Sequence, residues 1–272
     1  MEAAAVLLRD LVNERTGIYV DDRNLDIFME RLSSLILQRG LETPLDYYYL
    51  LKYDAEAESE WPRLIDTISV RETFFWREFE QIRALVEHIL PLHFSKPGAG
   101  IFRIWSAACA SGEEPLTIAM AINEAELWKY PIEIVASDAS SAALRIARTG
   151  VYRERSFRIL APHLQARYFT ACDNGWKMDR DIHRRVSWHK ANLTVGEEIA
   201  PLAASNVIFC RNVFIYFKPE TIKKVVESFA RYMKCPACLF VGAPESLLKL
   251  TTRFELKEIG AAFAYMRVRG ED

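Results

Sequence analysis

Two different patterns of apolar residues divide the chain. In residues 3–80 the apolar side chains recur every three or four positions, at Val6, Leu7, Leu11, Ile27, Phe28, Leu32, Leu35, Ile36, Tyr48, Leu50 and Leu51. This spacing places one apolar stripe on each of several short helices. Gly17 and the stretch 40–44, which runs from a glycine to Pro44, interrupt the pattern where helices end and begin. The pattern predicts an all-helical N-terminal domain over residues 1–80.

A single amphipathic segment follows this domain. It predicts a helix from about Glu78 to Leu90, and Pro91 with the turn-rich stretch 95–100 marks the end of that helix. We therefore expect a linker helix and a junction over residues 81–98.

From residue 99 to residue 272 short apolar runs alternate with helical segments. The expected strands are 101–105, 132–136, 206–210 and 238–241, and the expected helices are 115–127, 140–149 and 219–233. This alternation is typical of the α/β class, with a doubly wound parallel sheet. The closing pair 254–259 and 264–268 predicts an antiparallel hairpin.

The alternation is interrupted between about residues 152 and 192. Within that stretch Cys172-Asp-Asn-Gly175 is a hairpin-turn signal, because Asn and Gly tolerate positive φ. We therefore expect a small subdomain inserted into the α/β domain there.

Charge is distributed unevenly, although the formal net charge is only −2. Residues 1–80 hold 9 Lys and Arg against 17 Asp and Glu, whereas residues 81–272 hold 26 against 20. The stretch 145–190 is the basic extreme, with 11 basic and 4 acidic residues. The asymmetry indicates that an acidic partner binds the basic middle of the chain. The alternative is that these basic residues only form a solvated surface.

Several classes of protein are disfavoured. The N-terminal apolar run stops at Arg9-Asp10, too early for a signal peptide or a membrane span. The five scattered cysteines suit a reducing compartment, so we expect a cytoplasmic monomer without membrane insertion. Cys235-Pro-Ala-Cys238 has no second pair, so no metal site is expected. The sequence shows no marked interleaving of aromatic and basic residues, which disfavours nucleic acid as a substrate.

The turn after the first predicted strand carries the first candidate chemistry. In a doubly wound sheet ligands bind at the carboxyl ends of strands, and this turn runs from Ser106 to Pro115. Ala108, Ala110 and Gly112 stand where a nucleotide-binding turn needs small residues. The following Glu113 and Glu114 repel a phosphate and attract a cation, so S-adenosylmethionine fits better than NAD. The alternative is that both glutamates only cap a helix.

Asp138 follows the second predicted strand, 26 residues after Gly112. An acidic side chain in this place accepts hydrogen bonds from ribose hydroxyls. Considered without the preceding turn, an Asp in this position would more often cap the next helix. Together with the preceding turn, the ribose role is favoured.

Four blocks of sequence, in the same order, make the chain similar to the CheR-type chemoreceptor methyltransferases. They are Thr73-Phe-Phe-Trp-Arg77, Arg103-Ile-Trp-Ser-Ala-Ala-Cys-Ala-Ser-Gly-Glu-Glu-Pro115, Val207-Ile-Phe-Cys-Arg-Asn-Val-Phe-Ile-Tyr-Phe217 and Gly242-Ala-Pro-Glu-Ser246. The resemblance spans about residues 65–268. It implies a class I methyltransferase sheet that uses S-adenosylmethionine, yields S-adenosylhomocysteine and methylates glutamates on the helical cytoplasmic part of a chemoreceptor.

The resemblance also implies roles for individual residues. Thr73 and Arg77 would face the methionine end of the cofactor, and either Glu113 or Glu114 would bind its amino group. Asp138 would hold the ribose, Asn192 and Leu193 would lie along the adenine, and Arg211 with Asn212 would close the pocket. Tyr216 would lie beside the methyl group, which makes Arg77, Arg211 and Tyr216 the expected catalytic residues.

The implied reaction needs positioning more than proton transfer. A glutamate carboxylate has a pKa near 4.3 and is an ionised nucleophile at neutral pH, so no general base is required. The enzyme must align the carboxylate in line with the methyl group and strip away part of its water. The alternatives are a small-molecule methyltransferase of the same fold, and a weakly catalytic cofactor-binding scaffold in a signalling array.

Two departures from the family pattern bear on these expectations. Arg71 stands where the family commonly has Asn, so one cofactor contact is expected to differ. Relatives often carry a basic N-terminal domain that touches the receptor, whereas residues 1–80 are acidic here. The basic 145–190 region is therefore the expected receptor-binding surface, and reversing Arg180, Arg184 and Arg185 to Glu is expected to raise the KM for receptor.

Overall fold

The N-terminal part of the chain is a bundle of helices, as its apolar stripes predict. In the computed structural model, which describes residues 2–268, these helices are α1 (Glu2–Thr16), α2 (Leu25–Gln38), α3 (Pro44–Tyr53) and α4 (Ala57–Ile68), with a 3-10 turn η1 (Asp22–Asn24). Leu8, Leu32 and Leu64 are fully buried between them. Thr43 and Asp46 form a reciprocal capping box at the start of α3, where Pro44 is the first helical residue.

The next helix is longer than its sequence predicts. Helix α5 (Phe79–Ala84), a π-helical stretch η2 (Leu85–Ile89) and α6 (Leu90–Phe94) follow one another without a break. Pro91 therefore does not end the helix: it lies inside the continuous run, directly after the π-helical stretch. The helical N-terminal cluster ends at Ile68, and Phe75 is buried in the core of the α/β part. A domain boundary at residue 80 therefore falls too late.

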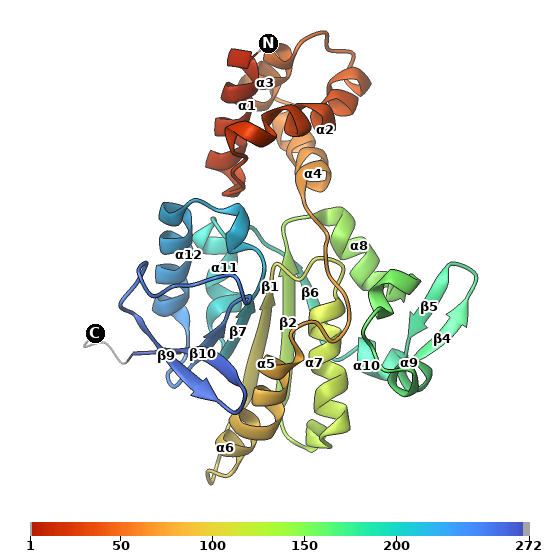
Figure 1. The fold of residues 1–272 in the computed structure, drawn as a ribbon, viewed down its shortest axis with the longest axis vertical. Helices are drawn as coiled ribbons and strands as arrows, with labels where there is room; N and C mark the ends of the chain where they lie inside the picture. The colour runs from red at the N-terminus through yellow and green to blue at the C-terminus, as the bar shows by residue number, and fades with distance from the viewer. Residues whose placement is uncertain (1, 269–272) are drawn as a thin grey trace.

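The α/β part is built on a seven-stranded sheet, with helices on both faces (Figure 1). Its strands are β1 (Phe102–Ala107), β2 (Ile132–Asp138), β6 (Val186–Lys190), β7 (Val207–Cys210), β8 (Cys238–Phe240), β9 (Phe254–Ile259) and β10 (Ala262–Arg267). The order across the sheet is β6-β2-β1-β7-β8-β10-β9, and β10 runs antiparallel to both of its neighbours. The doubly wound sheet and its closing hairpin are confirmed.

Two apolar layers cover the sheet. One contains α7 (Glu113–Glu124) and α8 (Ser141–Thr149) together with the α5–α6 helix, and the other contains α11 (Gly196–Ala203) and α12 (Pro219–Tyr232). The chain leaves β1 first toward β2 and β6, and later returns to the other side of β1 as β7. Ligands bind at such a reversal, outside the carboxyl ends of the strands.

A three-stranded antiparallel sheet forms the inserted subdomain. It pairs β3 (Val151–Tyr152), β5 (Gly175–Met178) and β4 (Phe169–Cys172) in that order, and the flanking helical segments are η4 (Glu154–Phe157), α9 (Pro162–Tyr168) and α10 (Arg180–His183). Cys172 pairs with Gly175 across the expected hairpin turn. The expected interval 152–192 runs too far, because β6 is the edge strand of the main sheet.

Candidate active site

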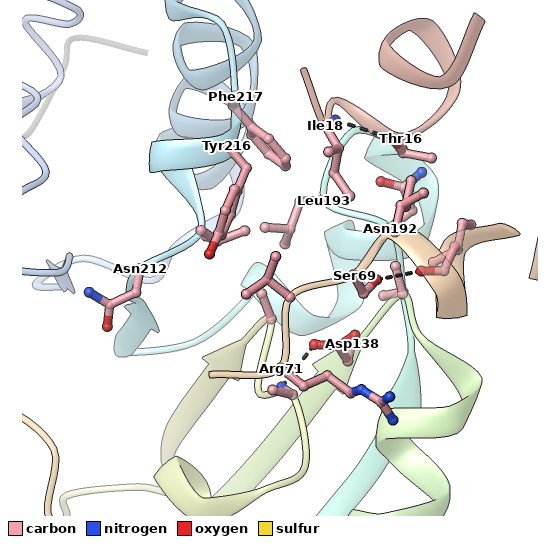
Figure 2. Close-up of a pocket in the computed structure, with 18 residues that line it drawn as sticks. Thr16, Ile18, Ser69, Arg71, Asp138, Asn192, Leu193, Asn212, Tyr216 and Phe217 are labelled. Carbon is pink, nitrogen blue, oxygen red and sulfur yellow. Dashed lines mark hydrogen bonds between the residues drawn. The ribbon is translucent and has the colours of Figure 1, made fainter. Parts of the chain in front are cut away.

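A cavity lies at the carboxyl ends of β1 and β2, where the N-terminal helices meet the α/β part (Figure 2). Its floor includes Ala108, Ala110 and Asp138. A second cavity adjoins the first, and the two share Val70, Ala108, Ala110 and Asn212 as wall residues. Together they form an elongated cleft, which suits a ligand with two chemically different ends.

The turn after β1 owes its shape to small residues in left-handed backbone conformations. Ala108, Ala110 and Gly112 have φ of 56°, 48° and 94°. Ala108 and Ala110 line both cavities. Gly112 lines neither of them, and a Cβ atom on it would lie 2.7 Å from the Trp188 ring. Gly112 is therefore needed for packing against β6, and the expectation that it contacts the cofactor loses its support.

Asp138, the last residue of β2, is the floor carboxylate of the first cavity. Its Oδ2 accepts a hydrogen bond from the Ala110 N–H at 2.8 Å, and its Oδ1 accepts one from the Ser140 N–H at 2.8 Å. Burial raises the pKa of this carboxyl, although the backbone donors oppose the shift. Because each carboxylate oxygen can accept a second hydrogen bond, Asp138 can fix the turn and still receive ligand hydroxyls.

Glu113 and Glu114 are adjacent in sequence but face different surroundings. Glu114 lines the second cavity, and its Oε1 accepts a hydrogen bond from the Ser106 hydroxyl at 2.6 Å. Glu113 lines neither cavity and is only 3% exposed. Its two oxygens accept hydrogen bonds from the hydroxyls of Ser111 and Ser156 at 2.7 and 2.9 Å. Burial raises the pKa of both glutamates.

Arg211 follows β7 and is almost fully buried, with 7% of its surface exposed. Its Nε lies 3.0 Å from Glu114 Oε2, and its Nη2 donates to the carbonyl oxygen of Arg77 at 2.6 Å. Nη1 donates to Gln81 Oε1 at 3.3 Å. The guanidinium thus joins the carboxyl end of β7 to the segment before α5. Arg211 also lines the second cavity, and its expected catalytic role stays a prediction.

The segment that carries Thr73 and Arg77 forms one wall of the second cavity. On either side of Arg77 the backbone is left-handed, with φ of 68° at Trp76 and 48° at Glu78. The Arg77 Nη1 donates to the carbonyl oxygen of Glu72 at 2.7 Å. Such conformations persist only where surrounding contacts enforce them, and here the bond from Arg211 to the Arg77 carbonyl does so.

The loop after β7 is held by a carboxylate from the Gly242–Ser246 block. Glu245 Oε2 accepts hydrogen bonds from the N–H groups of Asn212 and Gly242 at 2.9 and 2.6 Å, and its Oε1 accepts one from Ile215 N–H at 3.3 Å. A Cβ atom on Gly242 would lie 2.5 Å from the Asn212 side chain. These contacts give a physical reason for the Gly-x-x-Glu pattern: it fixes Asn212, which lines both cavities.

Asn192, Leu193 and Tyr216 line the first cavity, and Tyr216 points its hydroxyl into it (Figure 2). The Asn192 side-chain amide donates to the carbonyl oxygen of Arg15 at 2.8 Å, so this wall is tied to helix α1. Burial raises the pKa of the Tyr216 hydroxyl, which therefore stays protonated and able to donate at neutral pH.

Sequence reasoning missed the part of the wall that comes from the N-terminal domain. Those residues are Thr16, Ile18, Ile65, Ile68, Ser69 and Val70. Arg71, whose departure from the family pattern predicts an altered cofactor contact, also lines this cavity. No local signal distinguishes the others, because their apolar spacing is that of ordinary helix packing. Their place in the site follows from how the domain sits on the sheet.

The strand order, the reversal beside β1 and the acidic cleft at the carboxyl ends define a class I methyltransferase that uses S-adenosylmethionine. Residues 71–263 match the family model described as CheR methyltransferase, SAM binding domain, and residues 5–69 match that of the CheR all-alpha domain. The chain therefore belongs to the CheR methyltransferase family. Membership supports S-adenosylmethionine-dependent methylation in chemotaxis.

Named relatives agree with this family. The chain is 32% identical to chemotaxis protein methyltransferase 2 of Vibrio cholerae, across 95% of this chain and 91% of that protein. It is 30% identical to the chemotaxis protein methyltransferase of Escherichia coli K12, across 92% of this chain and 86% of that protein. No helix among residues 2–268 is both long and apolar enough to cross a membrane.

Partial matches among solved structures include other methyltransferases. The plantazolicin methyltransferase BpumL in complex with SAH matches 79% of this chain and 61% of its own, with a TM-score of 0.36 and 12% identity. Magnesium protoporphyrin IX methyltransferase from Synechocystis with bound SAM matches 80% of this chain and 91% of its own, with a TM-score of 0.35 and 12% identity.

Proposed function

We propose that this enzyme transfers the methyl group of S-adenosylmethionine to glutamate side chains of a chemoreceptor. The products are a glutamate methyl ester and S-adenosylhomocysteine. The observation that carries the proposal is the cleft itself. It has carboxylates along its floor, and beyond Tyr216 it continues into an open groove lined by Arg31 of α2 and by Val70.

Within the cleft we assign the two cavities to the two ends of the cofactor. Asp138 would receive the ribose hydroxyls, and Asn192 with Leu193 would flank the adenine in the first cavity. Glu114, beside Thr73 in the second cavity, would bind the amino group. We assign the amino-group role to Glu114 because its carboxylate faces the cavity, whereas Glu113 is enclosed elsewhere.

The fit to this cofactor rests on the charges of the cleft. Burial raises the pKa of Glu114 and of Asp138, which means that the protein alone compensates their negative charge incompletely. A ligand with a sulfonium and an ammonium group supplies positive charge to this cleft. A phosphate-bearing nucleotide would add negative charge instead.

The acceptor carboxylate would arrive at the junction of the cavities, where Val70, Ala108 and Asn212 meet. Bound there, S-adenosylmethionine supplies the electrophilic methyl group. Tyr216 would donate a hydrogen bond that orients the incoming carboxylate, and Arg77 would add positive charge from the second cavity. Since the carboxylate is already ionised, these residues need only align and partly desolvate it.

The groove beyond Tyr216 favours a macromolecular acceptor over a small molecule. Ile27, Val70 and Ile215 line it and are between 45% and 53% exposed. An enclosed pocket would be expected around a small substrate. A receptor helix that presents a glutamate beside apolar side chains would cover these exposed residues.

The basic region 145–190 divides into two parts that lie at opposite edges of the sheet. Arg184 and Arg185 follow α10 and precede β6, and so they lie at the amino edge, where the Arg185 guanidinium stacks 4.4 Å from the Trp128 ring centre. Arg158 lies 2.6 Å from Glu72, which lines the second cavity. We therefore narrow the proposed receptor contact to the part of the region near the cleft.

Charge reversal tests this docking surface. Arg158 is already paired with Glu72, so the test variant replaces Arg153 and Arg155, both exposed at the start of η4, with Glu. We expect the KM for receptor to rise about tenfold when it is measured at saturating S-adenosylmethionine, so that a change in cofactor affinity through η4 does not enter the result. The matched control reverses Arg184 and Arg185. A larger KM effect in the control than in the test variant would move the docking surface to the amino edge.

The function itself is tested with methyl-labelled S-adenosylmethionine. We expect label to enter a receptor cytoplasmic domain and to be released as methanol by alkali. Transfer of label to a small molecule without any receptor present would favour a small-molecule substrate. Tight cofactor binding without any ester would favour a cofactor-binding scaffold.

A further inference from the structure

We infer that Glu113 is a positioning residue that fastens the cofactor-binding turn to the inserted subdomain. Its carboxylate lies between the Ser111 hydroxyl of the turn, at 2.7 Å, and the Ser156 hydroxyl of η4, at 2.9 Å. The Tyr152 hydroxyl of β3 donates to the carbonyl oxygen of Ser111 at 3.0 Å. Two segments about 40 residues apart in sequence are thereby joined through one buried carboxylate.

The same cluster reaches the segment that carries Arg77. The carbonyl oxygen of Ser156 accepts a hydrogen bond from Phe75 N–H at 2.9 Å. The Phe75 ring packs edge-on against Tyr152, with centroids 4.9 Å apart. Thr117 adds a second link, because it accepts from Trp76 N–H at 3.2 Å and donates to the Glu113 carbonyl oxygen at 2.6 Å.

This arrangement separates Glu113 from a ligand role. Its side chain lines neither cavity and the residue is only 3% exposed, so a ligand in the cleft does not reach the oxygens that the two serine hydroxyls bond. Ser111, Ser156 and Tyr152 are between 2% and 8% exposed, so water competes little for these hydrogen bonds. A change in the position of η4 must therefore move the turn, or break a buried hydrogen bond.

The consequence for regulation rests on the proposed function. Arg155, which we propose to contact the receptor, is the neighbour of Ser156 in η4. A receptor bound there would stabilise the position of η4 and, through Glu113, that of the cofactor turn. By linkage, cofactor binding would stabilise η4 in return.

Four variants test whether Glu113 positions the turn or binds the cofactor directly. The probe is S-adenosylhomocysteine, and no receptor is present. Ser156→Ala removes one hydrogen bond. Glu113→Gln keeps both bonds without charge, because an amide and a serine hydroxyl can each donate or accept. Glu114→Gln removes charge at the proposed ligand. Ser205→Ala is the control, since it removes a buried hydroxyl that bonds the Leu202 carbonyl oxygen at 2.7 Å, far from the turn.

Affinity is measured by calorimetry, and order in η4 by hydrogen exchange of residues 150–160 with and without S-adenosylhomocysteine. We expect Ser156→Ala to raise the Kd about threefold to tenfold and to lose the ligand-induced protection of these residues. Glu113→Gln should keep the protection and stay within about twofold of the unaltered Kd, and Glu114→Gln should weaken binding at least tenfold. Ser205→Ala should change neither readout.

Two results would overturn the inference. One is a Ser156→Ala protein with unaltered affinity and unaltered protection. The other is a loss of affinity in Glu113→Gln as large as in Glu114→Gln, which would make Glu113 a ligand. Because the test uses no receptor, failure to methylate glutamate would refute the proposed function and leave this result standing.

Discussion

Glu113 and Glu114 occupy the same turn of α7 and differ in what surrounds their oxygens. Glu114 has an arginine 3.0 Å away and faces the cleft, whereas Glu113 is enclosed by hydroxyl groups. Both have raised pKa values because burial disfavours the charged form. At the scale of single residues, the groups around each carboxylate therefore underlie the proposed roles: Glu114 binds the cofactor, and Glu113 holds the turn in place.

The pH dependence of activity follows from these carboxylates. Because Glu114 and Asp138 have raised pKa values, they protonate at a higher pH than exposed acids do, and cofactor affinity should be lost as pH falls through those values. Burial also raises the pKa of Tyr216 above its ordinary value of 10.0, so no alkaline loss is expected near neutrality. The rate should be flat through neutral pH, because no general base is needed.

The measurement is kcat/KM for cofactor against pH at saturating receptor. Glu114→Gln should lower the plateau and shift the acid limb. The contribution of these acids to folding stability changes with pH in the opposite direction to cofactor affinity. Since they bind protons more tightly when folded, their contribution decreases as pH rises from the unfolded to the folded pKa. A histidine-like inflection near pH 6.5 that persisted in Glu114→Gln would contradict the account.

Short connections at the carboxyl edge of the sheet contain much of the strained backbone. Non-glycine residues with positive φ at this edge are Trp76, Glu78, Ala108, Ala110 and Asn212. Each such conformation costs about 1–3 kcal/mol and persists only where its surroundings enforce it. Arg211 and Glu245 supply hydrogen bonds to these connections, so at the scale of elements the site is a set of braced turns.

A pair of glycine substitutions tests this bracing. Gly112 and Gly98 both have positive φ, of 94° and 72°, but a Cβ atom at Gly98 would have no neighbour within 4 Å. We expect Gly98→Ala to cost about 1 kcal/mol of unfolding free energy, and Gly112→Ala about 3 kcal/mol or more, because the new methyl group meets Trp188. Urea unfolding measures both variants. Equal losses would mean that the contact with β6 does not constrain the turn.

The elements that the sequence predicts least well are those whose periodicity is weak. The edge strand β6 has the sequence Val-Ser-Trp-His-Lys, in which only Val186 is buried, so its apolar signal is slight. Helix α11 contains Pro201 and was not expected. By contrast, β1, β2 and β7 are buried apolar runs, and their register in the sheet follows from pairing that local sequence does not encode.

At the scale of the whole molecule, the N-terminal helices form part of the wall of the first cavity, which we propose binds the cofactor. Ile18 and Phe217 form an isolated antiparallel bridge beside the first cavity. Asp66 of α4 accepts hydrogen bonds from the Ser140 hydroxyl and the Ala142 N–H, at 2.7 and 2.9 Å. It thereby adds an acceptor at the start of α8, whose N-cap is Ser140, two residues after Asp138. Helix α4 lies beside this end of α8 (Figure 1). We therefore propose that the helical domain contributes to cofactor binding as well as to receptor contact.

Asp66→Ala tests that coupling. Removal of this acceptor should cost about 1–2 kcal/mol of stability and raise the Kd for S-adenosylhomocysteine several-fold, because the start of α8 adjoins the ribose carboxylate. Asp46→Ala is matched to it, since Asp46 caps α3 wholly within the helical domain. It should lower stability by a similar amount and leave the Kd unchanged. An equal change of Kd in both variants would mean that Asp66→Ala weakens cofactor binding only by destabilising the protein.

The candidate site could be predicted where its residues follow strand ends or belong to segments that resemble the family, as Thr73, Asn192 and Tyr216 do. Ala108, Glu114 and Asp138 follow strand ends that the sequence marks, and they line the cleft. Gly112 and Glu113 line neither cavity, because packing against β6 and the insertion decides which side of the turn faces the cleft. Their expected contacts with the cofactor stay predictions. The parts of the cavity wall that come from α1 and α4 depend on how the helical domain packs against the α/β part. No local sequence pattern predicts that packing.

The most direct test of the central claim is to locate the transferred methyl group. A receptor cytoplasmic domain is incubated with the enzyme and S-adenosylmethionine, digested, and sequenced by mass spectrometry. The account predicts methyl groups on glutamate side chains, lost on alkaline treatment and absent when those glutamates are replaced by alanine. Methyl groups that are stable to alkali, or that lie on nitrogen or sulfur atoms, would contradict it.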